Sequence, residues 1–270
     1  MRVAGLGKKI ILFFLICSMP IVLAGPKAVD KNTMEEYADS TKVVVLNYHK
    51  VDNMNISLSV LPADFEKQMA YLKENDYHTI TPDQLYDSME NQTELPENPV
   101  LITFDDGYKD NYTNAYPILK KYGFTATIFV ITDFLDKQPN YITWDQAREM
   151  EENGMRIESH TVHHKSMTEL SNDQLWQELT ESKKAIDEKL GKDTRYIAYP
   201  TGTYNLHIAQ MVKDAGYKAA FTIKYGNVDK ASNMYALERV PIFHTENTYK
   251  SFCERLNYIP VFERLGWIKS

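Results

Sequence analysis

Short apolar runs alternate with amphipathic segments from about residue 43 to residue 239 of this chain. The first run, residues 43–46, is apolar throughout and mostly β-branched, which predicts a strand buried on both faces. Amphipathic segments with helix-starting residues follow, such as those at Pro62 and at Thr81-Pro82. Strands that alternate with helices form a parallel sheet. We therefore expect one α/β domain over residues 42–270, built as a closed (β/α) barrel or as an open doubly wound sheet.

Chemically reactive side chains follow several of the expected strands. Asp105 and Asp106 come directly after an apolar run, and the sequence SHTVHH begins at Ser159 at the end of another. In both candidate folds the carboxyl ends of the parallel strands form the functional face. We therefore expect these groups to meet at one rim. Three further groups stand at expected strand ends: Tyr48-His49, residues 199–202 and Arg239.

The two histidines His160 and His164 are four residues apart, so that one tight turn can direct both toward a shared cation. Thr161 stands where the zinc-protease motif HExxH has glutamate, which excludes that motif. With Asp106 the pair makes a three-ligand set with open positions, as in catalytic metal sites. Asp105 then remains as a general base. An isolated Asp-Asp-Gly turn or histidine pair is commonly solvated surface, but their joint placement at strand ends favours a metal site.

Three motifs occur in a fixed order: TFDDG at residues 103–107, HTVHH at residues 160–164 and AYPTGTYN at residues 198–205. They resemble the motifs of the polysaccharide deacetylase family, the NodB-homology domain of carbohydrate esterase family 4. VVVLNYHKV at residues 43–51 and LERVPI at residues 237–242 extend the resemblance, which is greatest to the exported poly-N-acetylglucosamine deacetylases of the intercellular adhesin type. It covers roughly residues 43–245.

The resemblance implies a distorted (β/α)7 barrel and an enzyme that binds one divalent metal, usually zinc. The implied reaction removes acetyl groups from N-acetylglucosamine units of chitin-like polymers, peptidoglycan or biofilm polysaccharide, and releases acetate. Asp105 would be the base, and the metal ligands would be Asp106, His160 and His164. A set of two histidines and one aspartate also suits cobalt, nickel or iron.

The third motif departs from the family pattern. Ala198 replaces an arginine that in relatives binds the catalytic aspartate, and Tyr199 replaces a proline. Arg239 is the candidate substitute, with an ordinary surface ion pair as the alternative. Thr201 replaces a tyrosine whose backbone N–H binds the oxyanion, a role that tolerates a change of side chain.

The proton donor and the sugar-binding surface are left open by the sequence. His49, at the end of the first strand, and His244, in a loose match to a late family motif, are the two candidates for the general acid. His163 is expected not to bind the metal directly. Aromatic residues that could line a sugar groove, with core packing as the alternative, are Tyr48, Tyr108, Trp144 and Tyr199.

Two other functions compete with the deacetylase. The loss of arginine at Ala198 suggests a catalytically impaired polysaccharide-binding relative. A metal-dependent phosphoesterase is the other alternative, although it would need more carboxylate ligands or a basic phosphate clamp. The net charge of −7 argues against a protein that binds nucleic acid by neutralising phosphates. We expect a monomer whose partner is the polysaccharide substrate.

The first 24 residues have the composition of an export signal. Arg2, Lys8 and Lys9 precede an apolar run at residues 10–24, which Pro20 interrupts. This pattern predicts a secretory signal peptide, with an uncleaved membrane anchor as the alternative. Residues 25–41 are polar and are expected to be a linker. We therefore expect an exported bacterial protein, secreted or held at the membrane or cell wall, without an internal disulfide because cleavage leaves one cysteine.

Overall fold

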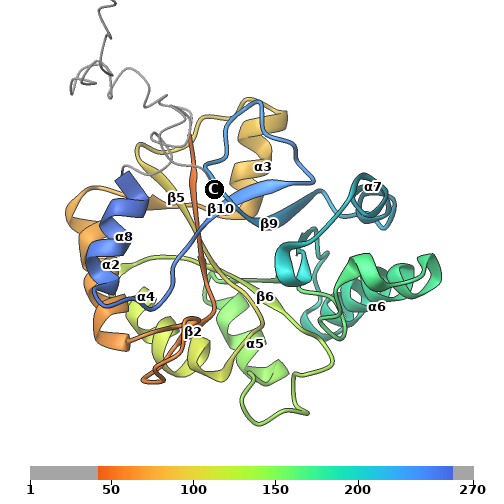
Figure 1. Ribbon diagram of the computed structural model, residues 1–270, viewed down its shortest axis with the longest axis horizontal. Coiled ribbons are helices and arrows are strands. Elements are labelled where there is room, and N and C mark those ends of the chain that lie inside the picture. Colours follow the sequence, from red (N-terminus) through yellow and green to blue (C-terminus); the bar gives the residue numbers. More distant parts are fainter. Residues whose placement is uncertain (1–41, 258–270) are drawn as a thin grey trace, which may run out of the picture.

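The computed structural model describes residues 42–257 and shows a closed barrel of parallel strands surrounded by helices (Figure 1). Its first strand pairs with two strands that are distant in sequence, which closes the ring. The predicted (β/α)7 barrel is confirmed, and the open doubly wound sheet is wrong. The seven strands of the described ring are, in order, β1 (Val44–Tyr48), β5 (Pro99–Phe104), β6 (Thr127–Val130), β7 (Arg156–Ser159), β8 (Tyr196–Ala198), β9 (Ala219–Tyr225) and β10 (Leu237–Pro241).

Three two-residue strands, which the apolar pattern did not predict, lie outside this ring. β4 (His78–Thr79) pairs with the start of β5, while β6 pairs only with the end of β5. β2 (Lys50–Val51) and β3 (Ser59–Val60) form a separate parallel pair just beyond the carboxyl end of β1. They therefore belong to the rim at which the reactive residues are expected.

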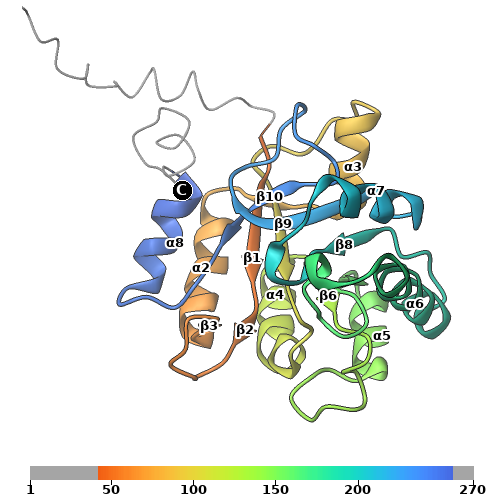
Figure 2. The ribbon, with the colours of Figure 1, turned by 45° about the vertical axis from the view of Figure 1, so that its right-hand side comes forward.

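Helices cover the outside of the ring (Figures 1 and 2). Three of them begin at a threonine or serine whose side chain caps the third helical residue in a reciprocal capping box. α8 was not predicted; it packs against α2 through the rings of Phe252 and Tyr71, whose centroids are 6.0 Å apart. The helices are α2 (Pro62–Glu74), α3 (Pro82–Glu90), α4 (Tyr116–Tyr122), α5 (Trp144–Glu152), α6 (Asn172–Leu190), α7 (Leu206–Asp214) and α8 (Thr248–Asn257). Three short helical turns join them: η1 (Asn111–Ala115), η2 (Met167–Glu169) and η3 (Pro200–Gly202).

The interior of the barrel is filled by side chains from strands that are not neighbours in the ring. The rings of Phe129 on β6 and Phe221 on β9 have centroids 5.4 Å apart, so their contact crosses the barrel. The guanidinium carbon of Arg239 on β10 lies 5.9 Å from the centre of the Phe129 ring. Arg239 therefore points into the barrel, and its side chain has no exposed surface.

The register between β9 and β10 shifts next to this arginine. Leu237 is the partner of Phe221, whereas Arg239 is the partner of Tyr225, so two residues on β10 span four on β9. Such irregularities redirect side chains and often lie beside active sites. Here the shift accompanies the only charged side chain on β10 that is fully buried.

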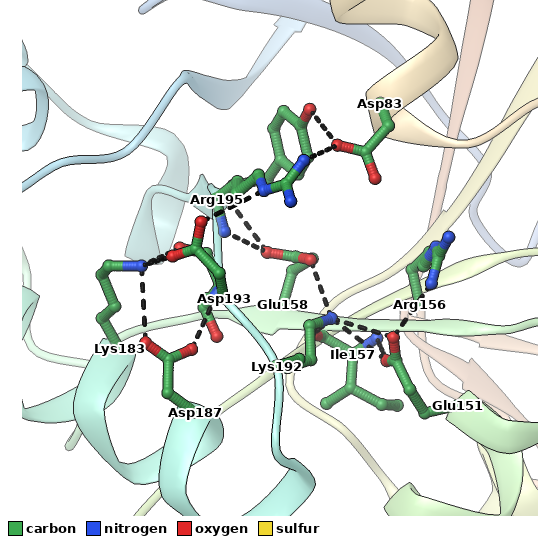
Figure 3. A network of polar contacts seen from close by, with 12 residues as sticks. Asp83, Glu151, Arg156, Ile157, Glu158, Lys183, Asp187, Lys192, Asp193 and Arg195 are labelled. Carbon is green, nitrogen blue, oxygen red and sulfur yellow. Dashed lines mark hydrogen bonds and ion pairs between the residues drawn. The ribbon is translucent and has the colours of Figure 1, made fainter.

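A polar network ties β7 to β8 at the end of β8 opposite to Ala198 (Figure 3). The buried carboxylate of Glu158 lies 3.0 Å from Lys192 Nζ and accepts hydrogen bonds from the backbone N–H groups of Arg195 and Tyr196. Lys192 also contacts the Glu151 carboxylate. Burial raises the pKa of Glu158 despite these contacts. The cation at Lys192 is therefore needed to offset a buried negative charge.

Lys192→Ala is expected to lower the free energy of unfolding by about 3–5 kcal/mol, because it leaves Glu158 buried without its cation. Chemical denaturation at pH 7 measures this change. Lys184→Ala is the control, since the Lys184–Glu188 pair is exposed and its loss should cost less than about 1 kcal/mol. Equal stability of the two variants would show that the Glu158–Lys192 pair does not support the barrel.

The remaining expectations about domains fall partly outside the described residues. The predicted signal peptide or anchor at residues 1–24, the linker at 25–41 and the end of the domain at 258–270 all lie there. Within residues 42–257, no helix has both the length and the apolar character needed to span a bilayer. Cys253, in the last described helix, forms no disulfide.

Candidate active site

The turn after β5 separates the two neighbouring aspartates. The backbone of Asp105 continues the hydrogen bonding of the sheet, because its N–H donates to the carbonyl of Tyr48 on β1 at 2.9 Å. Asp106 and Gly107 then both adopt left-handed conformations, with φ of 73° and 77°. A Cβ at Gly107 would lie 3.0 Å from Val130 Cγ1, so glycine suits both the conformation and the space. This turn gives the two carboxylates different neighbours.

Asp105 forms a two-point ion pair with Arg239. Arg239 Nη1 lies 2.8 Å from Asp105 Oδ1, and Nη2 lies 2.6 Å from Oδ2. Asn47 Nδ2 donates a further hydrogen bond to Oδ2 at 3.0 Å. The arginine is itself held by the Thr222 carbonyl, which accepts from Nε at 2.7 Å, and by Thr103 Oγ1. The contact expected between Arg239 and Asp105 is therefore present, and it is buried rather than on the surface.

The charge on Asp105 is stabilised by its surroundings. Burial alone would raise the pKa of this carboxyl group, but the charge of Arg239 and then that of His160 lower it by more. The net pKa lies well below the usual value for aspartate. Asp105 is therefore ionised at neutral pH, and its orientation is set by three hydrogen bonds from Arg239 and Asn47.

Asp106 faces the two histidines instead. Its Oδ1 lies 3.4 Å from Nε2 of both His160 and His164, and the three candidate ligand atoms lie within 4.8 Å of one another. His160 Nδ1 donates to the carbonyl of Ala198 at 2.8 Å, which leaves Nε2 free to bind a cation. No other group of three or more histidine, cysteine or acidic side chains within residues 42–257 is arranged to hold a metal.

Two observations show that these residues fit a divalent cation. Asp106 Oδ1 is buried and has no hydrogen-bond partner among the described residues, which is costly unless something else binds it. Burial lowers the pKa of His160, but the contact of its ring with the Asp106 carboxylate and the charge of Asp105 raise it by more. The surroundings thus stabilise positive charge at His160, whereas burial and the charge of His160 lower the pKa of His164. Three ligands of this kind leave positions open for substrate and water.

Comparison with known proteins agrees with the fold and with this arrangement. The family model described as "Polysaccharide deacetylase" matches residues 92–220. "Putative polysaccharide deacetylase YxkH" of Bacillus subtilis (strain 168) is 39% identical over 201 residues, which cover 74% of this chain and 71% of that protein. The poly-beta-1,6-N-acetyl-D-glucosamine N-deacetylase of Staphylococcus aureus (strain MSSA476) is 30% identical over 228 residues, covering 74% and 78%.

The chain belongs to the polysaccharide deacetylase family. A solved structure supports the assignment: Streptococcus pyogenes deacetylase PplD in complex with acetate matches with a TM-score of 0.76 and 31% identity, over 81% of this chain and 99% of that one. The predicted family and the predicted class of enzyme, a hydrolase of the deacetylase type, are therefore confirmed. The deacetylase motifs TFDDG and HTVHH carry Asp105, Asp106, His160 and His164, the residues that the barrel brings together.

The structure separates the two candidate proton donors. His49 follows β1, and its ring interacts electrostatically with Asp105, Asp106 and His160. The Nδ1 atoms of His49 and His244 are both buried without a hydrogen-bond partner among residues 42–257, so this feature does not separate them. His244 follows β10, and its backbone N–H donates to the carbonyl of Ser57 in the loop between β2 and β3. The charged groups of the site thus act on the ring of His49.

Most of the aromatic residues expected at a sugar groove lie in the core of the deacetylase instead. Tyr48 is fully buried, stacks on Phe104 and donates its hydroxyl to Gln68. Tyr199 is also fully buried, and its hydroxyl donates to the carbonyl of Tyr235. Trp144 is 7% exposed. For these three side chains the structure supports core packing, the alternative considered in the sequence analysis, and not a place in a sugar groove.

Tyr108 is the aromatic residue that does stand beside the site. It is partly exposed, and its ring stacks on that of Tyr141 with centroids 5.0 Å apart. Burial raises the pKa of Tyr108, and the negative charge of nearby Asp106 raises it further. Thr201 is exposed on the short helix after β8, with φ of 59°. Tyr108 and Thr201 therefore remain candidates for substrate contact.

Two polar residues of the site were missed by sequence reasoning. Asn47 is completely buried and binds Asp105; as the one polar residue inside the run VVVLNY it carried a detectable signal. Glu178 on α6 is buried against the loop that carries His164. It gave no such signal, because an acidic residue on a helix is ordinarily exposed.

Proposed function

We propose that this chain is a metal-dependent N-deacetylase of an extracellular polymer of N-acetylglucosamine, of the poly-β-1,6-linked type. One observation carries the proposal: two adjacent aspartates have separate partners, Asp105 with Arg239 and Asp106 with His160 and His164. One carboxylate is thereby left for proton transfer and the other for a metal. The Staphylococcus aureus relative named as a poly-beta-1,6-N-acetyl-D-glucosamine N-deacetylase supports the choice of polymer.

Asp106, His160 and His164 would hold the cation, for which we propose zinc, with cobalt, nickel and iron also suited to this ligand set. When bound, such a cation supplies Lewis acidity toward the acetyl carbonyl and the attacking water. Asp105 accepts a proton from that water, because it is ionised and held at two points by Arg239. The backbone N–H of Thr201, which follows β8 on the same rim, would donate to the developing oxyanion.

His49 donates the proton that the departing glucosamine nitrogen requires. Burial lowers the pKa of His49, and although the charges of Asp105 and Asp106 act in the opposite direction, the net pKa is below that of free imidazole. Its protonated form is therefore a stronger acid than a free imidazolium, but it is the minor form at neutral pH, so His49 takes up a proton before it donates one to the leaving group.

His49→Ala is expected to lower kcat/KM for deacetylation by about 10²-fold, at the low end of what general acids contribute. His244→Ala is the matched control, and its kcat/KM should change by less than about threefold, a difference worth under 1 kcal/mol. Initial rates of acetate release from one N-acetylglucosamine oligomer measure both variants. The reverse order of effects would transfer the role to His244.

The function is tested by acetate release from chitin oligomers, peptidoglycan and poly-β-1,6-N-acetylglucosamine, each with zinc and with chelator. We expect zinc-dependent release that is fastest with the β-1,6-linked polymer. Binding of polymer without acetate release by the zinc-loaded protein would instead identify a binding protein. Hydrolysis of a phosphodiester but not of the amide would favour the phosphoesterase.

We further propose that the chain is exported through residues 1–24 and acts as a monomer at the cell surface or outside the cell. The support is the basic and then apolar sequence of this segment and the extracellular nature of the proposed substrate. Cell fractionation followed by sequencing of the mature N-terminus distinguishes a cleaved signal from a retained anchor.

A further inference from the structure

The second histidine of the proposed metal site lies on a loop, and not on a strand. His160 is fixed at the end of β7, where its N–H donates to the Val130 carbonyl and its ring to the Ala198 carbonyl. His164 comes four residues later, and its side chain is 31% exposed. Thr161 and His164 both have positive φ, of 66° and 57°, which costs conformational energy in residues other than glycine. Such a loop keeps its shape only where neighbouring groups hold it.

Glu178 on α6 provides a direct hold on this loop. Its Oε2 accepts hydrogen bonds from two successive backbone N–H groups, those of Val162 at 2.8 Å and His163 at 2.9 Å. Its Oε1 accepts from Nδ1 of the His163 ring at 2.7 Å. The carboxylate therefore makes three contacts with the two residues in the middle of the loop, between the two ligands.

Stability alone does not account for a carboxylate at this position. Glu178 is 5% exposed, and its only ion-pair partner within residues 42–257 is His163. Its neighbours on the same face of α6, Leu175 and Leu179, are apolar and buried. A buried charge at such a place usually contributes less stability than an apolar side chain would. The backbone N–H groups of the loop are what this carboxylate is suited to bind.

The opposite side of the loop is also fixed. The carbonyls of Thr161 and Val162 accept from the backbone N–H groups of Thr132 and Asp133, each at 3.1 Å. The loop is thus held from two sides, with two of its carbonyls bound to the segment after β6 and the N–H groups of Val162 and His163 bound to α6. The N–H groups of Thr161 and His164 are bound more locally, by Ser159 Oγ and Thr161 Oγ1. Of the two sides, only the α6 contact depends on a single side chain, that of Glu178.

We propose that Glu178 is a positioning residue of the metal site, whose carboxylate sets the conformation of residues 161–164 so that His164 faces Asp106 and His160. The inference rests on the metal site proposed above. Glu178 does not bind the cation; it lowers the conformational freedom that His164 would otherwise lose on binding. His163 completes the contact through its ring, which explains the presence of a histidine that is not one of the three proposed ligands.

The test measures zinc affinity of the full chain after removal of metal, by competition with a chromophoric chelator. Glu178→Ala is expected to bind zinc about tenfold to hundredfold more weakly than the wild type, as for other residues that orient metal ligands. The visible spectrum of the cobalt-substituted protein should change as well, because the position of His164 changes. Unchanged zinc affinity and an unchanged cobalt spectrum would overturn the proposal.

Glu181→Ala is the matched control, since Glu181 lies on the same helix and is exposed. It should bind zinc like the wild type; a loss equal to that of Glu178→Ala would attribute the effect to helix charge and overturn the proposal. If Glu178→Ala does not fold, Glu178→Gln replaces it, because a neutral amide oxygen still accepts the backbone N–H groups, but more weakly. Several-fold weaker zinc binding is then expected, and wild-type affinity would overturn the proposal.

Wild-type zinc binding is measured first, because it separates the two hypotheses. A wild-type chain that binds no zinc refutes the metal site and with it the role of Glu178. A wild-type chain that binds zinc, together with a Glu178→Ala variant of equal affinity, refutes only the role of Glu178 and leaves the proposed function intact.

Discussion

Replacement of Asp105 by asparagine is expected to lower kcat/KM for deacetylation by about 10³-fold while leaving zinc binding close to that of the wild type. The amide has the same shape as the carboxylate but cannot accept a proton from water. Asp105 contacts Arg239 and Asn47, whereas neither histidine ligand forms a hydrogen bond with it, so the metal ligands should stay in place. Acetate release and a zinc titration of the same preparation measure the two effects.

The neighbouring residue supplies the control for this experiment. Asp106→Asn removes the carboxylate that lies 3.4 Å from both histidines, so it should weaken zinc binding as well as activity. The two variants differ by one position in the chain and share the same chemical change. If Asp105→Asn lost zinc and Asp106→Asn retained it, the proposed division between proton transfer and metal binding would be reversed.

Arg239→Met is expected to have the second large effect, on both stability and the pH profile. Without the guanidinium, Asp105 is a buried carboxylate whose main compensating charge is gone, and breaking a buried pair costs about 3–5 kcal/mol of unfolding free energy. Burial by itself raises the pKa of Asp105, and in this variant that effect would be opposed mainly by the charge of His160. The acidic limb of kcat/KM should therefore move to higher pH, and activity at neutral pH should fall.

The sign of the pH dependence follows from the depressed pKa of Asp105. In the wild type the ion pair contributes stability that is fully present above the unfolded value of about 3.9 and is lost as pH falls through the lower folded value. In Arg239→Met a raised folded pKa makes the carboxylate costly at neutral pH, and this cost is relieved as the pH is lowered. The difference in free energy of unfolding between the wild type and Arg239→Met should therefore become smaller as the pH is lowered toward 4.

Two variants make this prediction specific. Arg239→Lys keeps the charge but cannot form the two parallel hydrogen bonds, so intermediate stability and activity are expected. Arg148→Met removes an arginine from an exposed pair with Asp145 and should change stability by less than about 1 kcal/mol. An Arg239→Met protein with wild-type stability and pH profile would show that Arg239 does not hold Asp105.

Local sequence patterns were sufficient for most of the fold. The apolar runs that end near Phe104, Ser159 and Ala198 are strands, and capping residues such as Thr81 and Ser171 begin helices. These features depend on residues within a few positions of one another, so they can be recognised without the tertiary structure. The choice between a barrel and an open sheet depends on the pairing of β1 with both β5 and β10, which no local pattern specifies.

In the candidate site, too, the local motifs could be recognised from the sequence, whereas the directions of side chains could not. The motifs at Asp105-Asp106 and at His160 and His164 were visible because reactive residues followed apolar runs. The direction of a large ring was not visible: Tyr48 and Tyr108 both come just after or at the end of a strand, yet one is buried and the other partly exposed. Side-chain direction depends on what packs above each position, and that neighbour comes from a distant part of the chain.

The amino-acid sequence by itself determined the class of fold, the family and the residues of the proposed metal and proton-transfer sites, because short motifs at strand ends carry them. Only the tertiary structure decided that Arg239 contacts Asp105, since a guanidinium on β10 reaches the carboxylate that follows β5 through the barrel interior. The tertiary structure also showed that Glu178 accepts hydrogen bonds from the loop that carries His164. The Arg239–Asp105 contact joins residues 134 positions apart, which the closed ring brings within hydrogen-bonding distance. Glu178, in contrast, lies only 15 positions after His163, on the helix that follows the same strand.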